Sequence, residues 1–338
     1  MTPRIVTYAL AAAAIGAVTP AAAEPTAVKF GTNMPSVGDF AKKMVAPWLR
    51  RVEQDSAGTV KFHEFWGGSL IRDPGKFYEG MMNGIQDASI ILPSYTAALF
   101  PDFGLFALPM MFRGAGSGEA SVAGWKMHEK GLLGGLDKVF VATIFTNDNG
   151  GMHFNRPLKT VEDMRGLKIR TAGPEEADVI KAIGGVPVAM SINVVTESLN
   201  RGVIDGTMNG WSALQTFRIT PLIKSHVDAP FGVRSFFIAI NRKVFDALPQ
   251  PGRNAFEKNS GLELTKTIGA YYDDQGVQYR REAATAGRIV IAPKGEDLKK
   301  LEDKFKPMHD AWIKETPDNA KKYRALQEIL AAMRGSSS

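Results

Sequence analysis

The chain contains the stretch Asn155-Arg-Pro-Leu-Lys-Thr-Val-Glu-Asp-Met-Arg-Gly-Leu-Lys-Ile-Arg170, whose end, Leu167 to Arg170, predicts a short strand. A helical pattern follows at Glu175 to Ile183, and Val186 to Met190 predicts the next strand. Strand, helix and strand in this order are typical of a mainly parallel sheet. Arg170 closes its strand, at the kind of position where ligand sites of α/β proteins gather.

The same alternation extends in both directions along the chain. Apolar runs of strand length occur at Ala27 to Gly31, Val60 to Phe65, Ala88 to Leu92, Val139 to Phe145, Gly202 to Met208 and Phe236 to Ile240. Helical patterns follow in Arg253 to Ala286, as one or two helices, and in Glu296 to Arg334, as two. The sequence therefore predicts an α/β protein with a helical stretch, Arg253 to Ala286, that is long enough to run across two lobes.

The length of the chain and the composition of its two ends indicate how the protein is divided into segments and lobes. Arg4, the apolar run Ile5 to Val18 and the alanines before Glu24 are typical of a cleaved secretory signal at residues 1–23. The remaining chain still exceeds the ~250 to 300 residues that one core usually supports, which favours two lobes with a cleft between them. Residues 335–338, Gly-Ser-Ser-Ser, are interpreted as a tail.

Charge and composition exclude several functions. The net charge is +6 and the chain has no cysteine, so disulfides, thiolate metal sites and a cysteine nucleophile are excluded. Lysine and arginine are scattered and lie beside acids, and export removes access to nucleic acid, so we expect no nucleic-acid partner. A basic surface is compatible with an anionic ligand that is drawn toward a cleft.

No catalytic constellation is visible in the sequence. The histidines are isolated and form no His-Glu-x-x-His motif; they are His63, His128, His153, His226 and His309. The glycine-rich stretch Gly114 to Gly118 predicts a flexible loop, because it is neither a nucleophile elbow nor a phosphate loop. The acid pairs Glu175-Glu176 and Asp273-Asp274 point about 100° apart on a helix and are interpreted as solvated. We therefore expect no enzyme, no metal site and no cofactor.

Five motifs, taken together, resemble the DctP family, the periplasmic binding proteins of TRAP transporters. They are the stretch quoted above, Phe62-His-Glu-Phe-Trp-Gly-Gly-Ser-Leu70, Met82-Asn-Gly-Ile-Gln-Asp-Ala88, Gly185-Val-Pro-Val-Ala-Met190 and Gly202-Val-Ile-Asp-Gly206. They occur in the order and spacing of the family and extend over nearly the whole mature chain.

The resemblance implies a type II-like, two-lobed periplasmic binding fold of the TRAP subtype, with a long helix that braces both lobes. Lobe I is expected to contain 24–148 and about 235–280, and lobe II 149–234 and about 281–334. Closure of the cleft on a ligand would be the mechanism.

The resemblance also implies the binding site. Arg170 matches the family arginine that grips the ligand carboxylate, a role suited to a guanidinium because it presents two parallel donors and stays ionised. An ion pair between strands is the alternative for this arginine. Asn209 and Trp211 match positions that line the cleft, with turn and core packing as their alternative. Lobe I is expected to contribute Asn33, Trp66, Tyr95 and Phe112, and Phe236 is expected to line the cleft at the start of the returning strand; the aromatic residues could instead be core.

Departures from the family pattern narrow the ligand. Sialic-acid-binding relatives carry a second arginine where this chain has Gly150, and Glu and Tyr where it has Val194 and Thr196. The chain is more similar to the branch that binds 2-oxo, 2-hydroxy or aromatic monocarboxylates.

The expected function follows from these points. The protein would be a monomer in the periplasm that captures a small organic acid and delivers it to the small and large TRAP membrane subunits. Two alternatives stay open at this stage: a binding protein of an ATP-driven importer, and a secreted hydrolase with a dispersed site.

Overall fold

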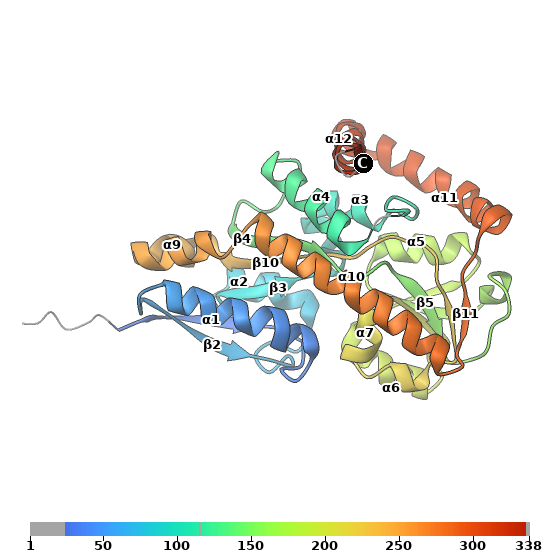
Figure 1. The fold of residues 1–338 in the computed structure, drawn as a ribbon, viewed down its shortest axis with the longest axis horizontal. Coiled ribbons are helices and arrows are strands. Elements are labelled where there is room, and N and C mark those ends of the chain that lie inside the picture. The colour runs from blue at the N-terminus through green and yellow to red at the C-terminus, as the bar shows by residue number, and fades with distance from the viewer. Residues whose placement is uncertain (1–23, 115, 336–338) are drawn as a thin grey trace, which may run out of the picture.

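The computed structural model describes residues 24–114 and 116–335, so the predicted signal peptide and most of the predicted tail lie outside the described residues. Two separate sheets form the framework, each with helices around it (Figure 1). The first has the order β2-β1-β3-β10-β4, with β1 Thr26–Gly31, β2 Val60–Phe65, β3 Ala88–Ile91, β4 Val139–Thr146 and β10 Ser235–Asn241. The second has the order β11-β9-β5-β8-β6-β7, with β5 Gly151–Phe154, β6 Lys168–Thr171, β7 Val186–Ala189, β8 Gly206–Asn209, β9 Ser225–Val227 and β11 Ile289–Ile291.

Both sheets are parallel where the sequence alternates strand and helix, and antiparallel where the chain crosses between lobes. β1 pairs in parallel with β2 and β3, and β6 pairs in parallel with β7 and β8. β10 returns from the second lobe and inserts antiparallel between β3 and β4. The predicted strands are present, but the one expected from Gly202 begins only at Gly206, because Gly202 has a φ of 68° in a turn after a helix.

Helices cover the sheets of both lobes. Their bounds are α1 Ala46–Asp55, α2 Phe77–Met82, α3 Gly104–Ala107, α4 Ser117–Glu129, α5 Pro174–Ala182, α6 Val195–Asn200, α7 Trp211–Thr216, α8 Arg242–Ala247, α9 Gln250–Lys258, α10 Leu262–Thr285, α11 Gly295–Glu315 and α12 Pro317–Gly335. The predicted flexible loop at Gly114 to Gly118 is wrong at its second half, where Ser117 and Gly118 begin α4. Asp273, which was interpreted as solvated, accepts hydrogen bonds from both of their backbone N–H groups.

Two short segments cross between the lobes side by side. Residues 147–150 connect β4 to β5, and residues 228–234 connect β9 to β10. They are paired by backbone hydrogen bonds from Asn147 to Arg234 and from Gly150 to Gly232. These two segments form a two-stranded ribbon, and its side chains lie where the lobes meet.

The long helix α10 contacts both lobes, as the sequence predicted, and in Figure 1 it runs across the front of both sheets. In the first lobe Thr265 shares a 2.8 Å hydrogen bond with Thr143 of β4. In the second lobe Arg280 forms an ion pair with Asp228 and lies over the ring of Trp211.

Buried apolar clusters occupy both faces of the first sheet and separate parts of the second lobe. Alternate residues of β10 enter different clusters, Phe237 and Ala239 on one face and Ile238 and Ile240 on the other. The predicted lobe II segment 281–334 is divided between clusters: Leu301 and Phe305 of α11 pack in the second lobe, whereas α12 packs with the cluster of the first. The domain boundaries stay a prediction.

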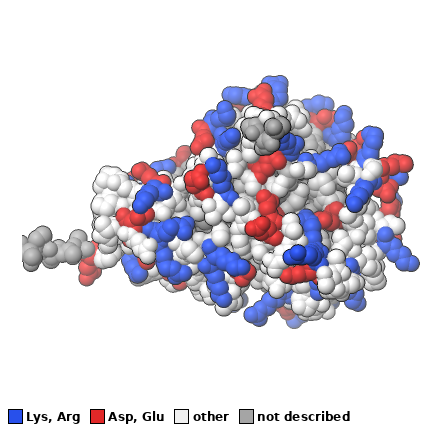
Figure 2. All heavy atoms as spheres, in the orientation of Figure 1, with Lys and Arg blue, Asp and Glu red and all other residues white. Residues whose placement is uncertain are grey.

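Charged residues of both signs are interspersed on the face shown in Figure 2. Within residues 24–114 and 116–335, no helix combines the length and apolar character needed to cross a bilayer.

We predict that Gly269→Ala destabilises the protein, although alanine is the better helix former. A Cβ at Gly269 would lie 2.7 Å from the Cα of Gly118, a backbone atom that is not free to rotate away. Overpacking of this kind costs about 1 to 3 kcal/mol, whereas helix propensity alone would stabilise by about 1 kcal/mol. Urea unfolding decides between the two signs, and a stabilised variant would show that α4 and α10 are not in close contact.

Candidate ligand-binding site

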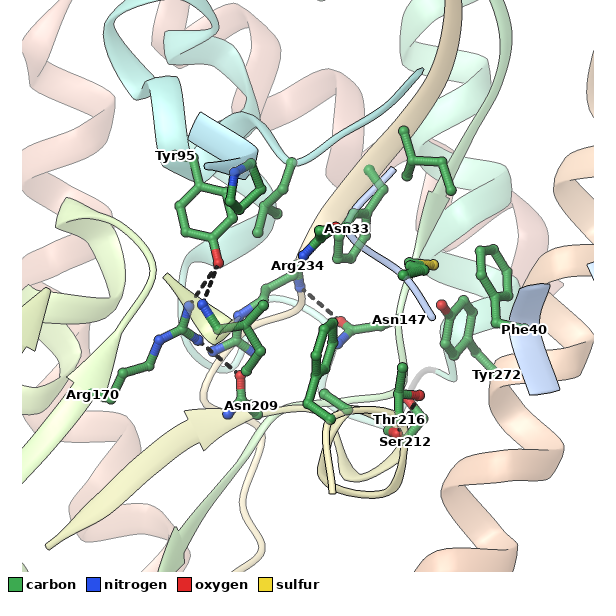
Figure 3. A pocket seen from close by; sticks show the side chains of 18 residues that line it. Asn33, Phe40, Tyr95, Asn147, Arg170, Asn209, Ser212, Thr216, Arg234 and Tyr272 are labelled. Carbon is green, nitrogen blue, oxygen red and sulfur yellow. Dashed lines mark hydrogen bonds between the residues drawn. The ribbon is translucent and has the colours of Figure 1, made fainter. Parts of the chain in front are cut away.

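A pocket of about 70 Å³ lies between the two lobes. Its apolar wall comes mainly from the first lobe and the returning strand: Met34, Phe40, Ile90, Leu92, Phe236 and Tyr272. Its polar groups gather at the carboxyl ends of β6 and β8 and in the crossing ribbon, and include Arg170, Asn209, Asn147 and Arg234. The pocket is thus apolar along one side and cationic at one end (Figure 3).

Arg170 is the fixed cation of this pocket. Its side chain is only 1% exposed, and its donors are oriented by the protein: Nε donates to the Met190 carbonyl, Nη1 to Asn209 Oδ1 and Nη2 to the Tyr95 hydroxyl, each at 2.9 Å. In the part of the chain that the structure describes, no Asp or Glu oxygen lies within ion-pair distance of this guanidinium. The alternative reading as an inter-strand ion pair is therefore not what the structure shows.

Tyr95 connects the two lobes at the rim of the pocket. It follows β3 in the first lobe, yet its hydroxyl oxygen contacts Arg170 and also accepts a hydrogen bond from the backbone N–H of Ile192 at 3.0 Å. Asn193, beside it, bonds the Asn33 side chain and the Arg72 carbonyl of the first lobe. The side chains thus hold the lobes in a closed arrangement.

A second buried arginine lies in the crossing ribbon. Arg234 is 6% exposed, its backbone N–H donates to Asn147 Oδ1, and its Nη2 contacts the Met208 carbonyl. Its Nε lies 2.6 Å from Glu176 Oε1, in a charge pair without hydrogen-bond alignment. Glu176 is 2% exposed, so the prediction that this acid is solvated is wrong.

Five of the eight predicted site residues line the pocket: Arg170, Asn209, Tyr95, Asn33 and Phe236. The other three lie elsewhere. Phe112 is 1% exposed and stacks on Phe106 in the core, and Trp66 packs against Phe30. Trp211 is buried behind the pocket, where its ring stacks on His226.

Sequence reasoning missed Arg234, Asn147 and Tyr272. Asn147 and Arg234 reach the pocket from the two segments of the crossing ribbon and Tyr272 reaches it from α10, and no local motif marks them. Gly150 gave a partial signal for a second arginine in the pocket, because sialic-acid-binding relatives carry an arginine at this position. In this structure a Cβ at Gly150 would lie 3.7 Å from Arg234 Nη1, so Arg234 occupies the neighbouring space. Burial raises the pKa of Tyr272 well above its usual value, so this hydroxyl stays protonated.

Two histidines that are isolated in the sequence meet behind Asn209. His153 of β5 and His226 of β9 face each other across the strands with Nδ1 atoms 2.8 Å apart. Because His153 Nε2 lies 3.1 Å from the Asn209 carbonyl, which only accepts, His153 donates there and receives a bond from His226 at Nδ1. Burial lowers the pKa of both rings below the usual histidine value, which favours their neutral forms in the folded state. No group of three potential metal ligands occurs within the described ranges.

An acidic residue fixes the start of α7, which carries Ser212 into the pocket wall. Asp148 accepts hydrogen bonds from the backbone N–H groups of Trp211 and Ser212 and from the Ser212 hydroxyl. Burial raises the pKa of Asp148, an effect that these hydrogen bonds and Arg280 oppose. The ribbon thereby positions the second-lobe side of the pocket.

Two α/β lobes joined by a crossing ribbon, with a pocket between them that is apolar along one side and cationic at one end, are the architecture of periplasmic solute-binding proteins. The chain matches the model of the DctP family, bacterial extracellular solute-binding protein family 7, over residues 30–316. It belongs to this family, and the resemblance found in the motifs is confirmed. Membership favours a TRAP transporter over an ATP-driven importer, and a receptor over a hydrolase.

Relatives and solved structures agree with this assignment. The chain is 24% identical to the C4-dicarboxylate-binding periplasmic protein DctP of Rhodobacter capsulatus, over 86% of this chain and 87% of that protein. It is similar in fold to a marine metagenome TRAP solute-binding protein specific for aromatic acids, in complex with 3-hydroxybenzoate (TM-score 0.85, 24% identity, 91% and 99% of the two chains). A TRAP solute-binding protein from Rhodoferax ferrireducens with copurified benzoate has the same TM-score, at 22% identity over 93% and 100%. The two-lobed fold is therefore confirmed.

We predict that acid destabilises the protein through the histidine pair. Burial lowers the pKa of His153 well below its usual value and lowers that of His226 to about 4, with Arg288 adding to the shift and Asp228 opposing it. At acid pH the folded state then binds fewer protons than the unfolded state. The contribution of these two neutral histidines to the free energy of unfolding is therefore fully present above about pH 6.5 and is lost as the pH drops toward 4. His226 alone accounts for up to about 3 kcal/mol.

Thermal melting of the wild type and two variants between pH 7.5 and 4 tests this. His226→Asn keeps a donor toward His153 but does not titrate, so its melting temperature should depend less steeply on pH. His63→Asn, at an exposed position, should melt as the wild type does. Equal acid slopes in all three proteins would contradict the prediction.

Proposed function

We propose that this chain captures a small organic acid in the periplasm by cleft closure and delivers it to the small and large membrane subunits of a TRAP transporter. Arg170 binds the carboxylate, and Asn209, Tyr95, Asn33 and Phe236 complete the site. Cleavage of residues 1–23 would release the protein into the periplasm. One observation supports this above all: Arg170 is a buried guanidinium without an acidic partner in the described chain.

The donor inventory of Arg170 supports an anionic ligand. A guanidinium has five N–H donors, and the protein accepts from three of them. Burying a cation without a counter-charge is costly, whereas a carboxylate accepts two parallel N–H bonds and supplies the missing charge. A carboxylate in the pocket would therefore satisfy both requirements of this side chain.

The remainder of the pocket supports a ligand with an apolar body. Phe40, Phe236 and Ile90 are among the apolar side chains that line the pocket. Similar proteins are described as binding 3-hydroxybenzoate, benzoate or C4-dicarboxylates, all of which carry a carboxylate. We propose that the ligand of this chain belongs to this broad class of small carboxylates.

Closure would depend on contacts that join the lobes. Tyr95 contributes a first-lobe hydroxyl to the same guanidinium that binds the ligand, so ligand binding and lobe contact share one group. A ligand that requires Arg170 in this orientation therefore favours the closed state.

We predict that Arg170→Met weakens binding of carboxylates by about 30-fold or more, because truncating one partner of a buried charge pair costs about 2 kcal/mol at the least. A thermal-shift screen of refolded protein against carboxylic acids and neutral sugars identifies the ligand, since 100 times the dissociation constant adds ~2.7 kcal/mol of stability. Calorimetry then measures the variant, with Arg165→Met, at an exposed arginine of the same stretch, as control. Unchanged affinity in a folded Arg170→Met protein, or shifts with neutral sugars only, would overturn the proposal.

We also predict that Tyr95→Phe weakens binding by about tenfold, the worth of one or two hydrogen bonds at the lobe contact. The loss should appear as faster ligand dissociation in stopped-flow fluorescence, because the variant destabilises the closed state. A slower association with unchanged dissociation would contradict a role in closure.

A further inference from the structure

The two arginines of the pocket differ in their charge balance. Arg170 has neutral partners only, the Met190 carbonyl, Asn209 and Tyr95. Arg234 has a buried acid, Glu176, at 2.6 Å from its Nε. Of the two guanidinium groups that line the pocket, one is therefore balanced by a paired acid and the other is not.

Glu176 is held in this position from two sides. It lies in the first turn of α5, and its Oε2 accepts hydrogen bonds from the Ala172 backbone N–H at 2.8 Å and from the Thr171 hydroxyl at 3.2 Å. Thr171 directly follows Arg170 at the end of β6. The same strand end thus presents one arginine to the ligand and, through Glu176, neutralises the other.

Nothing else in the pocket lining adds charge. Apart from Arg170 and Arg234, the described residues that line it are apolar or neutral polar side chains. A ligand with one carboxylate would match the net positive charge. A second carboxylate would be buried opposite an arginine that already has its acid, and an uncompensated buried charge is strongly unfavourable.

We propose that Glu176 is a specificity-determining residue, which neutralises Arg234 and thereby restricts the pocket to monocarboxylates with an apolar body and rejects dicarboxylates. This inference rests on the proposed function and deepens it by naming the substrate class. It separates the chain from relatives that are named for C4-dicarboxylates. Glu176 does not line the pocket, so it acts through Arg234 as a positioning residue.

Matched acids that differ only in a methyl group or a carboxylate test the inference. The pairs are pentanoate with glutarate and 3-methylbenzoate with isophthalate, and calorimetry at fixed pH and salt gives the ratio of monoacid to diacid affinity. The wild type should prefer the monoacid by about tenfold or more. In Glu176→Gln, Arg234 loses its acidic partner and becomes able to pair with a second ligand carboxylate. The ratio of monoacid to diacid affinity should therefore fall by about tenfold or more.

Three further variants separate selectivity from general damage. Glu175→Gln removes the neighbouring charge of the same helix, which has no ion pair with Arg234, and should keep the wild-type ratio within about twofold. The double variant Glu176→Gln with Arg234→Met removes both charges and should keep the monoacid preference. Glu176→Asp withdraws the acid without removing it and should lower the ratio less than Glu176→Gln does; it replaces Glu176→Gln if that protein does not fold by circular dichroism.

Each contrary result overturns a distinct statement. A wild type that binds the diacids as well as the monoacids, or binds neither pair, overturns the substrate class. An unchanged ratio in folded Glu176→Gln, or in Glu176→Asp in its place, overturns the role of Glu176. A tenfold loss of monoacid binding in the double variant would show that Arg234 itself binds the carboxylate, which overturns its description as a neutralised arginine. The proposed function fails separately, if no acid of the wider screen binds through Arg170.

Discussion

A guanidinium that is 1% exposed has to find partners inside the protein or in a ligand, and the partners of Arg170 come from three parts of the chain. Met190 follows β7, Asn209 ends β8 and Tyr95 follows β3 of the other lobe. Satisfying one side chain therefore fixes the ends of β7 and β8, the strands on either side of β6, and the approach of the first lobe. The shape of the cleft depends on this arrangement, and so does its preference for a negative ligand.

The ribbon between the lobes supports the same site from the other side. Its two segments are hydrogen-bonded to each other, and they carry Asn147 and Arg234 into the pocket while Asp148 caps α7. Residues that connect the lobes are thus also residues of the pocket. A change in the angle between the lobes necessarily changes the pocket as well, which is the physical basis for coupling ligand binding to closure.

The alternation of strands and helices and the long helix could be predicted from the sequence, and the family motifs also pointed to Arg170, Asn209 and Tyr95, which the structure places in the pocket lining. Strand-end positions and family motifs are local signals in the sequence, and they were enough to point to these residues. Trp66 and Phe112 were assigned wrongly to the pocket lining because an aromatic residue gives the same pattern in a core as in a ligand wall. The local sequence indicates a solvated Glu176 because its partner Arg234 is 58 positions away, and only the crossing ribbon brings the two together.

The long helix α10 has a mechanical consequence. Gly269 is in backbone contact with α4 of the first lobe, and Arg280 is paired with Asp228 of the second. A rotation that opens the cleft must therefore either curve this hydrogen-bonded rod or separate that ion pair. Both cost energy that grows with the amplitude of the rotation, so α10 acts as an elastic restraint that limits how far the lobes swing apart.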